Sequence, residues 1–291
     1  MILLPYGHDQ SVYGRQWATW ALIVLNVLVF LFTWVSGFGV EDELERRTRA
    51  FESVLLTYPD AQIDVSVLDG APGELREVLS DLVQLDATAP LTEGDIALED
   101  ATRDLLETYR GLPAQRFGYR PGDPSALNLM SSLFVHGGFW HLFGNMLFLW
   151  LAGAVIECFW DRGLFLGLYV LAGVGATLAQ HLSEPHSLVP IIGASGAISG
   201  MLGAFVVGYP KTRVRMLWAA IPFGVGHFHV PAWLLIPLWA AIQLFWALLT
   251  PHDGVAHWAH LGGFAVGVVA AVVVKRMDWD IADAGDGRSG I

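Results

Sequence analysis

Six apolar stretches constrain the fold of this 291-residue chain more than any other feature. Each has the roughly 20 residues that an α-helix needs to cross the hydrocarbon core of a bilayer. The chain is 54% hydrophobic and only 15% charged, which is typical of an integral membrane protein. We therefore predict an all-α, polytopic membrane protein with a bundle of six transmembrane helices. The predicted spans are residues 17–38, 134–159, 163–181, 191–209, 231–249 and 258–274.

An acidic segment separates the first two spans. Almost all of the net charge of -12 lies between Glu41 and Asp123. Apolar residues in this segment recur at helical spacing, and prolines and glycines interrupt them. We predict a small helical insertion; the alternative is a partly disordered acidic loop. The three apolar faces are Leu44, Phe51 and Leu55; Leu75, Val78, Leu79 and Leu82; and Leu98, Leu105 and Tyr109.

The order of these stretches predicts five segments. They are a cytoplasmic lead (1–16), the first transmembrane helix (17–38), an extracytoplasmic acidic, partly helical insertion (39–124), a core holding spans two to six (125–276) and a cytoplasmic polar tail (277–291). The first apolar stretch lacks a small-residue cleavage site, so we interpret it as a span. Residues 214–230 are too short in their apolar part to cross, and we expect them to lie at the membrane surface.

Basic residues predict the orientation of the spans. With six spans, both termini lie on one side, and the short loops 183–190 and 250–256 on the other side carry no Lys or Arg. Short cytoplasmic loops are enriched in Lys and Arg, so we expect cytoplasmic termini, in the inner membrane of a bacterium. The basic residues on the terminal side are Arg15, Arg162, Lys211, Arg213, Arg215, Lys275 and Arg276.

Four polar residues fall in the outer part of three different spans. Ser195 lies near the outer start of the fourth span, His260 lies near that of the sixth, and His141 and Asn145 lie in the first turns of the second. At a rise of 1.5 Å per residue, each lies within about 10 Å of the outer boundary. Polar side chains inside a membrane are functional candidates by default. The topology therefore predicts one polar site near the outer surface.

The chemistry of these side chains suggests roles. A serine hydroxyl needs an adjacent base to act as a nucleophile, and a histidine can take and return the proton. His141 and Asn145 are four residues apart on one helix face and can donate hydrogen bonds to an oxyanion, as can the backbone N–H of Ser195. No acidic residue in the outer part of a span can orient the histidine, so we predict a Ser-His dyad.

Alternatives remain for each member of this set. Singly, a serine among small residues is more often a helix contact, and an intramembrane asparagine more often bonds to another helix. His257, one turn before His260, is the rival base, and Ser199, one turn after Ser195, is the rival nucleophile. His136 and His257 are otherwise interpreted as structural residues.

The motifs around these residues resemble those of the rhomboid intramembrane serine proteases. The resemblance covers the predicted spans and the approach to the second span, and excludes the acidic insertion. The segments that carry it are His141-Leu142-Phe143-Gly144-Asn145, similar to HxxxN; Gly193-Ala194-Ser195-Gly196, similar to GxSG; Ala259-His260-Leu261-Gly262-Gly263, similar to AHxxG and followed by Gly267; and Phe117-Gly118-Tyr119-Arg120-Pro121.

The resemblance implies that Ser195 is the nucleophile and His260 the base, with His141, Asn145 and the Ser195 amide forming the oxyanion hole. It implies a peptidase that cleaves transmembrane segments of single-span membrane proteins, with the bilayer as its environment. No motif indicates a metal, a cofactor or a nucleic acid. Many members carry an aromatic residue one turn after the serine, packed on the histidine; this chain has Ser199 there.

Two other functions fit parts of the pattern. An inactive rhomboid-like protein that binds membrane helices as a chaperone or trafficking factor usually lacks the serine or the histidine, whereas this chain has both. A channel or transporter needs polar residues through the whole bilayer. The inner halves of the second, fourth and sixth spans are almost wholly apolar, which argues against a path across the membrane.

Overall fold

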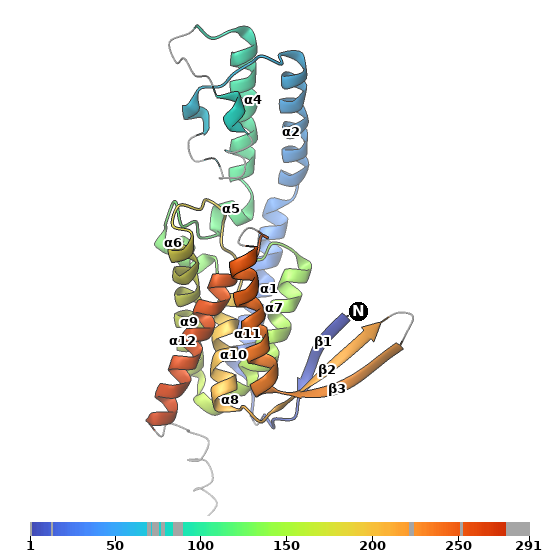
Figure 1. Cartoon of the computed structure of the whole chain (residues 1–291), viewed down its shortest axis with the longest axis vertical. Helices are drawn as coiled ribbons and strands as arrows, with labels where there is room; N and C mark the ends of the chain where they lie inside the picture. Colours follow the sequence, from blue (N-terminus) through green and yellow to red (C-terminus); the bar gives the residue numbers. More distant parts are fainter. Residues whose placement is uncertain are drawn as a thin grey trace, which may run out of the picture.

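The computed structural model describes residues 2–12, 14–68, 71, 76, 79–83, 90–220, 224–250 and 253–277. The molecule is elongated, with a bundle of membrane-length helices in its middle (Figure 1). A helical lobe extends from one end of the bundle, and a three-stranded antiparallel sheet lies toward the other end. The fold class predicted from the sequence, a helical membrane bundle with a helical insertion, is confirmed.

Five helical segments are long and apolar enough to cross a membrane. The second of them is continuous from Phe139 to Trp160 and contains one π-helical turn between α7 and α8. The remaining predicted span is the shorter apolar helix α10. Their bounds are α1 Trp17–Gly37, α7 Phe139–Phe148, the π-helical turn Leu149–Gly153, α8 Ala154–Trp160, α9 Arg162–Ser183, α10 Ser195–Gly208, α11 Ala232–Leu249 and α12 His257–Arg276.

Helix α10 is short and lies inside the bundle. Its 14 residues extend for about 21 Å, which is less than the roughly 30 Å of a hydrocarbon core. Most of its side chains are buried, which is possible because so many of them are small. A short central helix cannot reach both membrane surfaces, and the first residue of α10, Ser195, is partly buried within the bundle.

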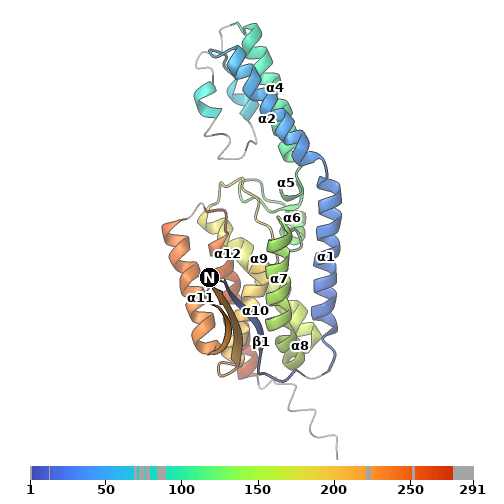
Figure 2. The same ribbon diagram turned by 90° about the vertical axis from the view of Figure 1, so that its right-hand side faces the viewer.

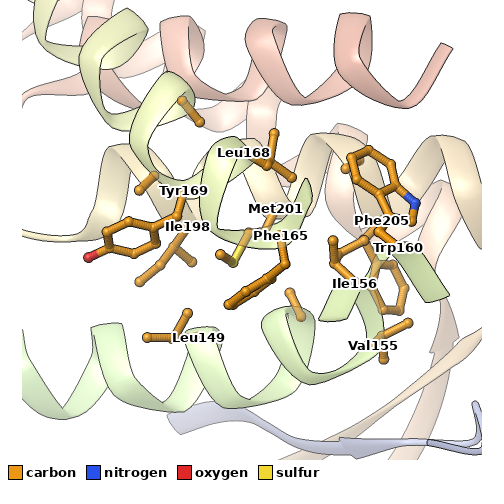
Figure 3. Close-up of a cluster of buried hydrophobic side chains, with 14 of the residues drawn as sticks. Leu149, Val155, Ile156, Trp160, Phe165, Leu168, Tyr169, Ile198, Met201 and Phe205 are labelled. Atoms are coloured by element: carbon orange, nitrogen blue, oxygen red, sulfur yellow. The ribbon is translucent and has the colours of Figure 1, made fainter. Parts of the chain in front are cut away.

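Large side chains fill the space between α10 and its neighbours (Figure 3). Phe165 and Tyr169 of α9 are almost completely buried against Met201 of α10 and Leu149 of the π-helical turn. Inside a membrane, lipid tails are as apolar as these side chains, so close packing and hydrogen bonds hold helices together. This cluster therefore fixes α9 and α10 as the rigid centre of the bundle.

A buried carboxylate attaches α1 to this centre. Glu157 Oε1 accepts a hydrogen bond from the Ala18 N–H at 2.9 Å, and Oε2 accepts from the N–H of Thr19 at 2.7 Å and from its hydroxyl at 2.8 Å. The first N–H groups of a helix have no partner within the helix and attract negative charge. The Arg162 guanidinium lies 3.6 Å from the same carboxylate. Glu157 thus supplies the N-terminal cap that α1 lacks in its own sequence.

The acidic insertion forms a lobe with its own hydrophobic core. Helix α2 (Val40–Thr57) continues the direction of α1 after a break at Gly39, and α4 (Glu93–Arg110) returns beside it (Figure 2). Thr92 and Asp95 form a capping box at the start of α4. The short elements η1 (Val65–Leu68) and η2 (Ser80–Leu82) cover the helix pair, and α5 (Pro113–Phe117) and α6 (Ala126–Ser131) connect it to α7.

The predicted apolar faces of the insertion agree with this core. Phe51, Leu98 and Leu105 are buried in it, with Leu44 and Leu55 packed against them. Leu79 is buried and Leu82 packs beside it, whereas Leu75 and Val78 lie outside the described residues. The described part of the insertion is thus helical rather than a disordered loop. The division into five segments stays a prediction, and its tail, apart from Met277, lies outside the described residues.

Residues 214–230 have a conformation that the sequence analysis did not predict, and their expected place at the membrane surface stays a prediction. This segment is a β-hairpin, β2 (Arg213–Ala220) and β3 (Gly224–Pro231), and β2 also pairs with β1 (Ile2–His8) at the amino end of the chain. The sheet order is β1-β2-β3, all antiparallel. A strand satisfies its backbone groups through partners distant in sequence, here about 200 residues away, so an apolar segment read alone resembles a surface helix.

We predict that Glu157→Ala destabilises the protein without removing a group from the polar site. The N–H groups of Ala18 and Thr19 would lose their acceptor at a buried position. We expect the free energy of unfolding to fall by about 2 kcal/mol, and the unfolding temperature to fall by a few degrees. Thermal unfolding in detergent measures this temperature. Glu52→Ala, at an exposed position on α2, is the control. An unchanged unfolding temperature for Glu157→Ala would contradict this role.

Candidate active site

Three helices begin at the end of the bundle that faces the lobe. They are α7, α10 and α12, and they deliver the predicted polar residues to one layer (Figures 1 and 2). A cleft of about 700 Å³ opens there. Ser195, His260 and His141 all line it, together with parts of the loops before α7, α10 and α12. The structure therefore brings three of the four predicted site residues together around one cavity, and Asn145 lies behind this lining.

Ser195 and His260 are within hydrogen-bonding distance of each other. His260 Nε2 lies 2.9 Å from Ser195 Oγ, although the two residues are 65 positions apart in sequence. Such a distance allows the imidazole to take the hydroxyl proton, provided that Nε2 carries a free lone pair. Both side chains are partly buried at the cleft wall.

Glycines set this distance. A Cβ added at Gly263 of α12 would overlap the carbonyl oxygen of Gly196, and one at Gly267 would overlap that of Gly200. The backbones of α10 and α12 are thus in direct contact along two turns, as glycines four residues apart on each helix allow. Ser195 directly precedes Gly196, and His260 lies one turn before Gly263, so the contact that joins the helices also aligns the two side chains.

Helix α11 supplies two side chains that the sequence analysis did not identify. The Gln243 Oε1 atom lies 2.7 Å from His260 Nδ1, and the Trp239 ring lies 6.1 Å from the imidazole, centroid to centroid. Gln243 is the only amide or charged side chain in an otherwise apolar helix. A lone polar residue in a span usually faces the bundle interior, so the sequence pattern could have identified Gln243 as a residue that contacts other helices.

His141 and Asn145 lie beside the segment that precedes Ser195. A Cβ on Gly193 would be 2.7 Å from His141 Nε2 and 3.8 Å from Asn145 Nδ2. Gly193 has a φ of 111°, in the region that favours glycine, so this position needs glycine for both its backbone and its space. Asn145 donates one N–H to the His141 carbonyl at 2.9 Å, and its amide has a second hydrogen to offer.

The rival residues have other partners. The Ser199 hydroxyl donates to the Ser195 carbonyl at 2.6 Å, the usual bond from a helix serine to the preceding turn. His257 Nε2 lies 3.0 Å from Asp253 Oδ2 and its Nδ1 lies 2.9 Å from Gln243 Oε1. The hydrogen bond from His257, with one from the Val255 N–H, lowers the pKa of Asp253.

His136 packs against a predicted site residue. Its ring is buried 5.1 Å from that of His141, edge to face, and its Nδ1 donates to the Phe134 carbonyl at 3.1 Å. This position agrees with its interpretation as a structural residue that supports His141.

The part of the chain that forms the cleft is similar to known proteins. Residues 123–277, just over half of the chain, match the family model of the rhomboid domain. The chain belongs to the rhomboid family. Rhomboid protein 1, mitochondrial, of Saccharomyces cerevisiae is 30% identical over 158 residues, which are 52% of this chain and 43% of the relative. Rhomboid protease GluP of Bacillus subtilis is 38% identical over 78 residues, which are 27% of this chain and 15% of the relative. The chain thus matches less than half the length of either protein.

Family membership and the apolar helices make this rhomboid a multi-pass membrane protein. Another relative, Presenilin-associated rhomboid-like protein A, mitochondrial, of Danio rerio, is 30% identical over 145 residues, which are 49% of this chain and 36% of the relative. A further similar protein is chloroplastic by name. Because the relatives come from several kinds of membrane, they do not support the bacterial inner membrane that the sequence analysis expected.

We predict that Gly267→Ala damages this site from a distance. The added methyl group would force α10 and α12 apart two turns below His260. We expect a lower unfolding temperature and at least tenfold slower labelling of Ser195 by a fluorophosphonate, because a displacement of about 1 Å can reduce reactivity about 100-fold. Gly167→Ala in α9, where no atom lies within 4 Å of the added Cβ, is the matched control. Equal labelling of the two variants would contradict the proposed alignment.

Proposed function

We propose that this rhomboid is an intramembrane serine endopeptidase that cleaves transmembrane segments near the outer membrane boundary. The observation that carries the proposal is the 2.9 Å separation of Ser195 Oγ and His260 Nε2 at the wall of a recessed cleft. The name of the similar Bacillus subtilis protein, which calls it a protease, points in the same direction. A purely binding rhomboid-like protein would have no use for a serine aligned with an imidazole.

The proposed reaction is an acyl transfer, first from the substrate to Ser195 and then to water. Ser195 Oγ attacks the scissile carbonyl carbon while its proton moves to His260 Nε2, and the carbonyl π electrons move to the oxygen. The C–N bond then breaks, and the His260 proton passes to the leaving nitrogen. Water hydrolyses the acyl-enzyme by the same two steps, with His260 again taking and returning a proton.

The negative oxygen formed in each step needs donors. The Ser195 N–H stands at the start of α10, where backbone donors are unpaired within the helix and the helix dipole favours negative charge. His141 and Asn145 lie next to Gly193, two residues before the nucleophile. These three groups form the proposed oxyanion hole. Donors held in place before the reaction are effective because little reorganisation is required of them.

The position of the cleft limits the substrate. An intact helix hides its carbonyl groups in hydrogen bonds, so a transmembrane substrate has to unwind before Ser195 can attack. Gly or Pro near the end of the substrate helix makes unwinding easier. Small residues follow Ser195 on α10, and we expect a small residue such as Ala or Ser before the cut. The proposed substrates are therefore single-span membrane proteins, cut near the end of their helix.

The proposed orientation places the cleft on the outer side of the membrane. The basic residues lie at the opposite end of the bundle: Arg162 is the first residue of α9 and contacts Glu157 of α8, Arg213 lies on β2, and Lys275 donates to the Val207 carbonyl at 2.6 Å. Since short cytoplasmic segments are rich in Lys and Arg, that end is proposed to be cytoplasmic, together with both termini. The acidic lobe would then lie outside.

We predict that Ser195→Ala and His260→Ala each reduce peptide-bond cleavage to background while the protein stays folded. Groups that act in one step fail together, so the double variant should be no worse than either single variant. The measurement is cleavage of a single-span substrate by the purified protein in detergent. Ser199→Ala is the control, because its hydroxyl bonds to a backbone carbonyl. Substantial cleavage by Ser195→Ala would remove Ser195 as the nucleophile.

A milder effect is expected for Asn145→Ala. Loss of one oxyanion donor typically lowers turnover by about 100- to 1000-fold. The variant should therefore keep measurable cleavage with little change in KM, because the oxyanion exists only along the reaction path. Steady-state kinetics separates the two parameters. A change confined to KM would assign Asn145 to substrate binding instead.

A further inference from the structure

A chain of polar contacts runs from the loop between α11 and α12 to the nucleophile. Asp253 Oδ2 lies 3.0 Å from His257 Nε2, and His257 Nδ1 lies 2.9 Å from Gln243 Oε1. The same oxygen lies 2.7 Å from His260 Nδ1, and His260 Nε2 lies 2.9 Å from Ser195 Oγ. One amide oxygen of α11 thus lies between two imidazoles of α12.

The position of that oxygen decides where the His260 proton sits. An amide oxygen only accepts hydrogen bonds and has two lone pairs, so it can accept from both rings. His260 then carries its proton on Nδ1, and Nε2 presents a lone pair to Ser195. With the amide turned the other way, its NH₂ group would donate to both rings. The His260 proton would then be on Nε2, facing Ser195, and the ring could not act as a base.

Asp253 and His257 favour the first arrangement. A carboxylate only accepts hydrogen bonds, so His257 donates through Nε2; it also donates through Nδ1 to the amide oxygen. With the amide oxygen toward the ring, both His257 nitrogens act as donors, and the negative charge of Asp253 favours this arrangement over one in which Nδ1 accepts a hydrogen bond.

We propose that Gln243 is a positioning residue of the Ser195–His260 dyad, held with its oxygen toward His260 by the His257–Asp253 pair. The inference rests on the proposed peptidase function and deepens it. Gln243 fixes the tautomer and orientation of the base before the substrate arrives. As the Ser195 proton moves to Nε2, the Nδ1–H bond to Gln243 strengthens because its donor becomes charged. The amide thus takes the place of the acidic residue that the outer parts of the spans lack.

The test compares three variants with the wild-type protein. Gln243→Met keeps the length of the side chain and removes the acceptor; Gln243→Glu keeps an acceptor oxygen. Gln115→Met is the matched control, because it removes a buried glutamine of α5 that bonds to Tyr109 in the lobe. The measurements are the rate of Ser195 labelling by a fluorophosphonate, kcat and KM for a single-span substrate, and the ¹⁵N chemical shifts of the His260 ring in detergent.

We expect labelling and kcat to fall about tenfold or more in Gln243→Met, since one ordinary hydrogen bond corresponds to a factor of that order. KM should stay unchanged, because Gln243 does not line the cleft. The His260 ring should show an Nδ1–H tautomer in the wild type and in Gln243→Glu, and lose it in Gln243→Met. Gln243→Glu and Gln115→Met should be labelled within about threefold of the wild-type rate.

Two results would overturn the assignment. One is a Gln243→Met protein with wild-type labelling and an unchanged ring spectrum. The other is a Gln243→Glu protein labelled as slowly as Gln243→Met, which would mean that the shape of the side chain matters and its oxygen does not. If the wild-type protein itself is not labelled at Ser195, the proposed peptidase function fails, which is a separate outcome from these two.

Discussion

The direct backbone contact between α10 and α12 is the interaction on which the rest of this rhomboid depends. A Cβ on Gly263 would overlap the carbonyl oxygen of Gly196, and one on Gly267 would overlap that of Gly200. Without water to drive association, helices in a bilayer are held by such packing. Because Ser195 and His260 stand near the start of these two helices, the distance between the proposed nucleophile and base is set by backbone contact, and flexible side chains have little freedom to change it.

The length of α10 converts this contact into a usable site. A helix of full membrane length would carry Ser195 to the bilayer surface, whereas 14 residues leave it inside a cleft. The N-terminal ends of α7, α10 and α12 converge there, and each brings the positive end of its helix dipole. A site that develops negative charge on oxygen is well placed at such a convergence. The position of the N-terminal end of α10 therefore affects both the depth of the site and the electrostatic potential within it.

Much of this arrangement could be predicted from the sequence, because helix length and small-residue spacing are local signals. The spans of α9, α11 and α12 differ from the expected ones by only a few residues, and Ser195 lies beside His260, as a dyad of the two would require. The sheet was missed because β1 and β2 pair across about 200 residues. Gln243 was missed for another reason: as the lone polar residue of an apolar helix it signals a contact inside the bundle, but its partner, His260, is known only from the structure.

The lobe and the cleft are connected through backbone as well as through α1. After α5, the chain passes beneath the lobe and pairs with the segment before α10: the Tyr119 N–H donates to the Ile191 carbonyl at 3.0 Å, and the Ile191 N–H returns a bond at 2.8 Å. The Tyr119 hydroxyl also lies 2.9 Å from His181 Nδ1 at the end of α9. Ile191 lines the cleft and lies four residues before Ser195. The lobe has a separate core, but two backbone hydrogen bonds join the segment after it to a wall of the cleft. The segment before the lobe is α1, and Glu157 binds the N-terminal end of that helix.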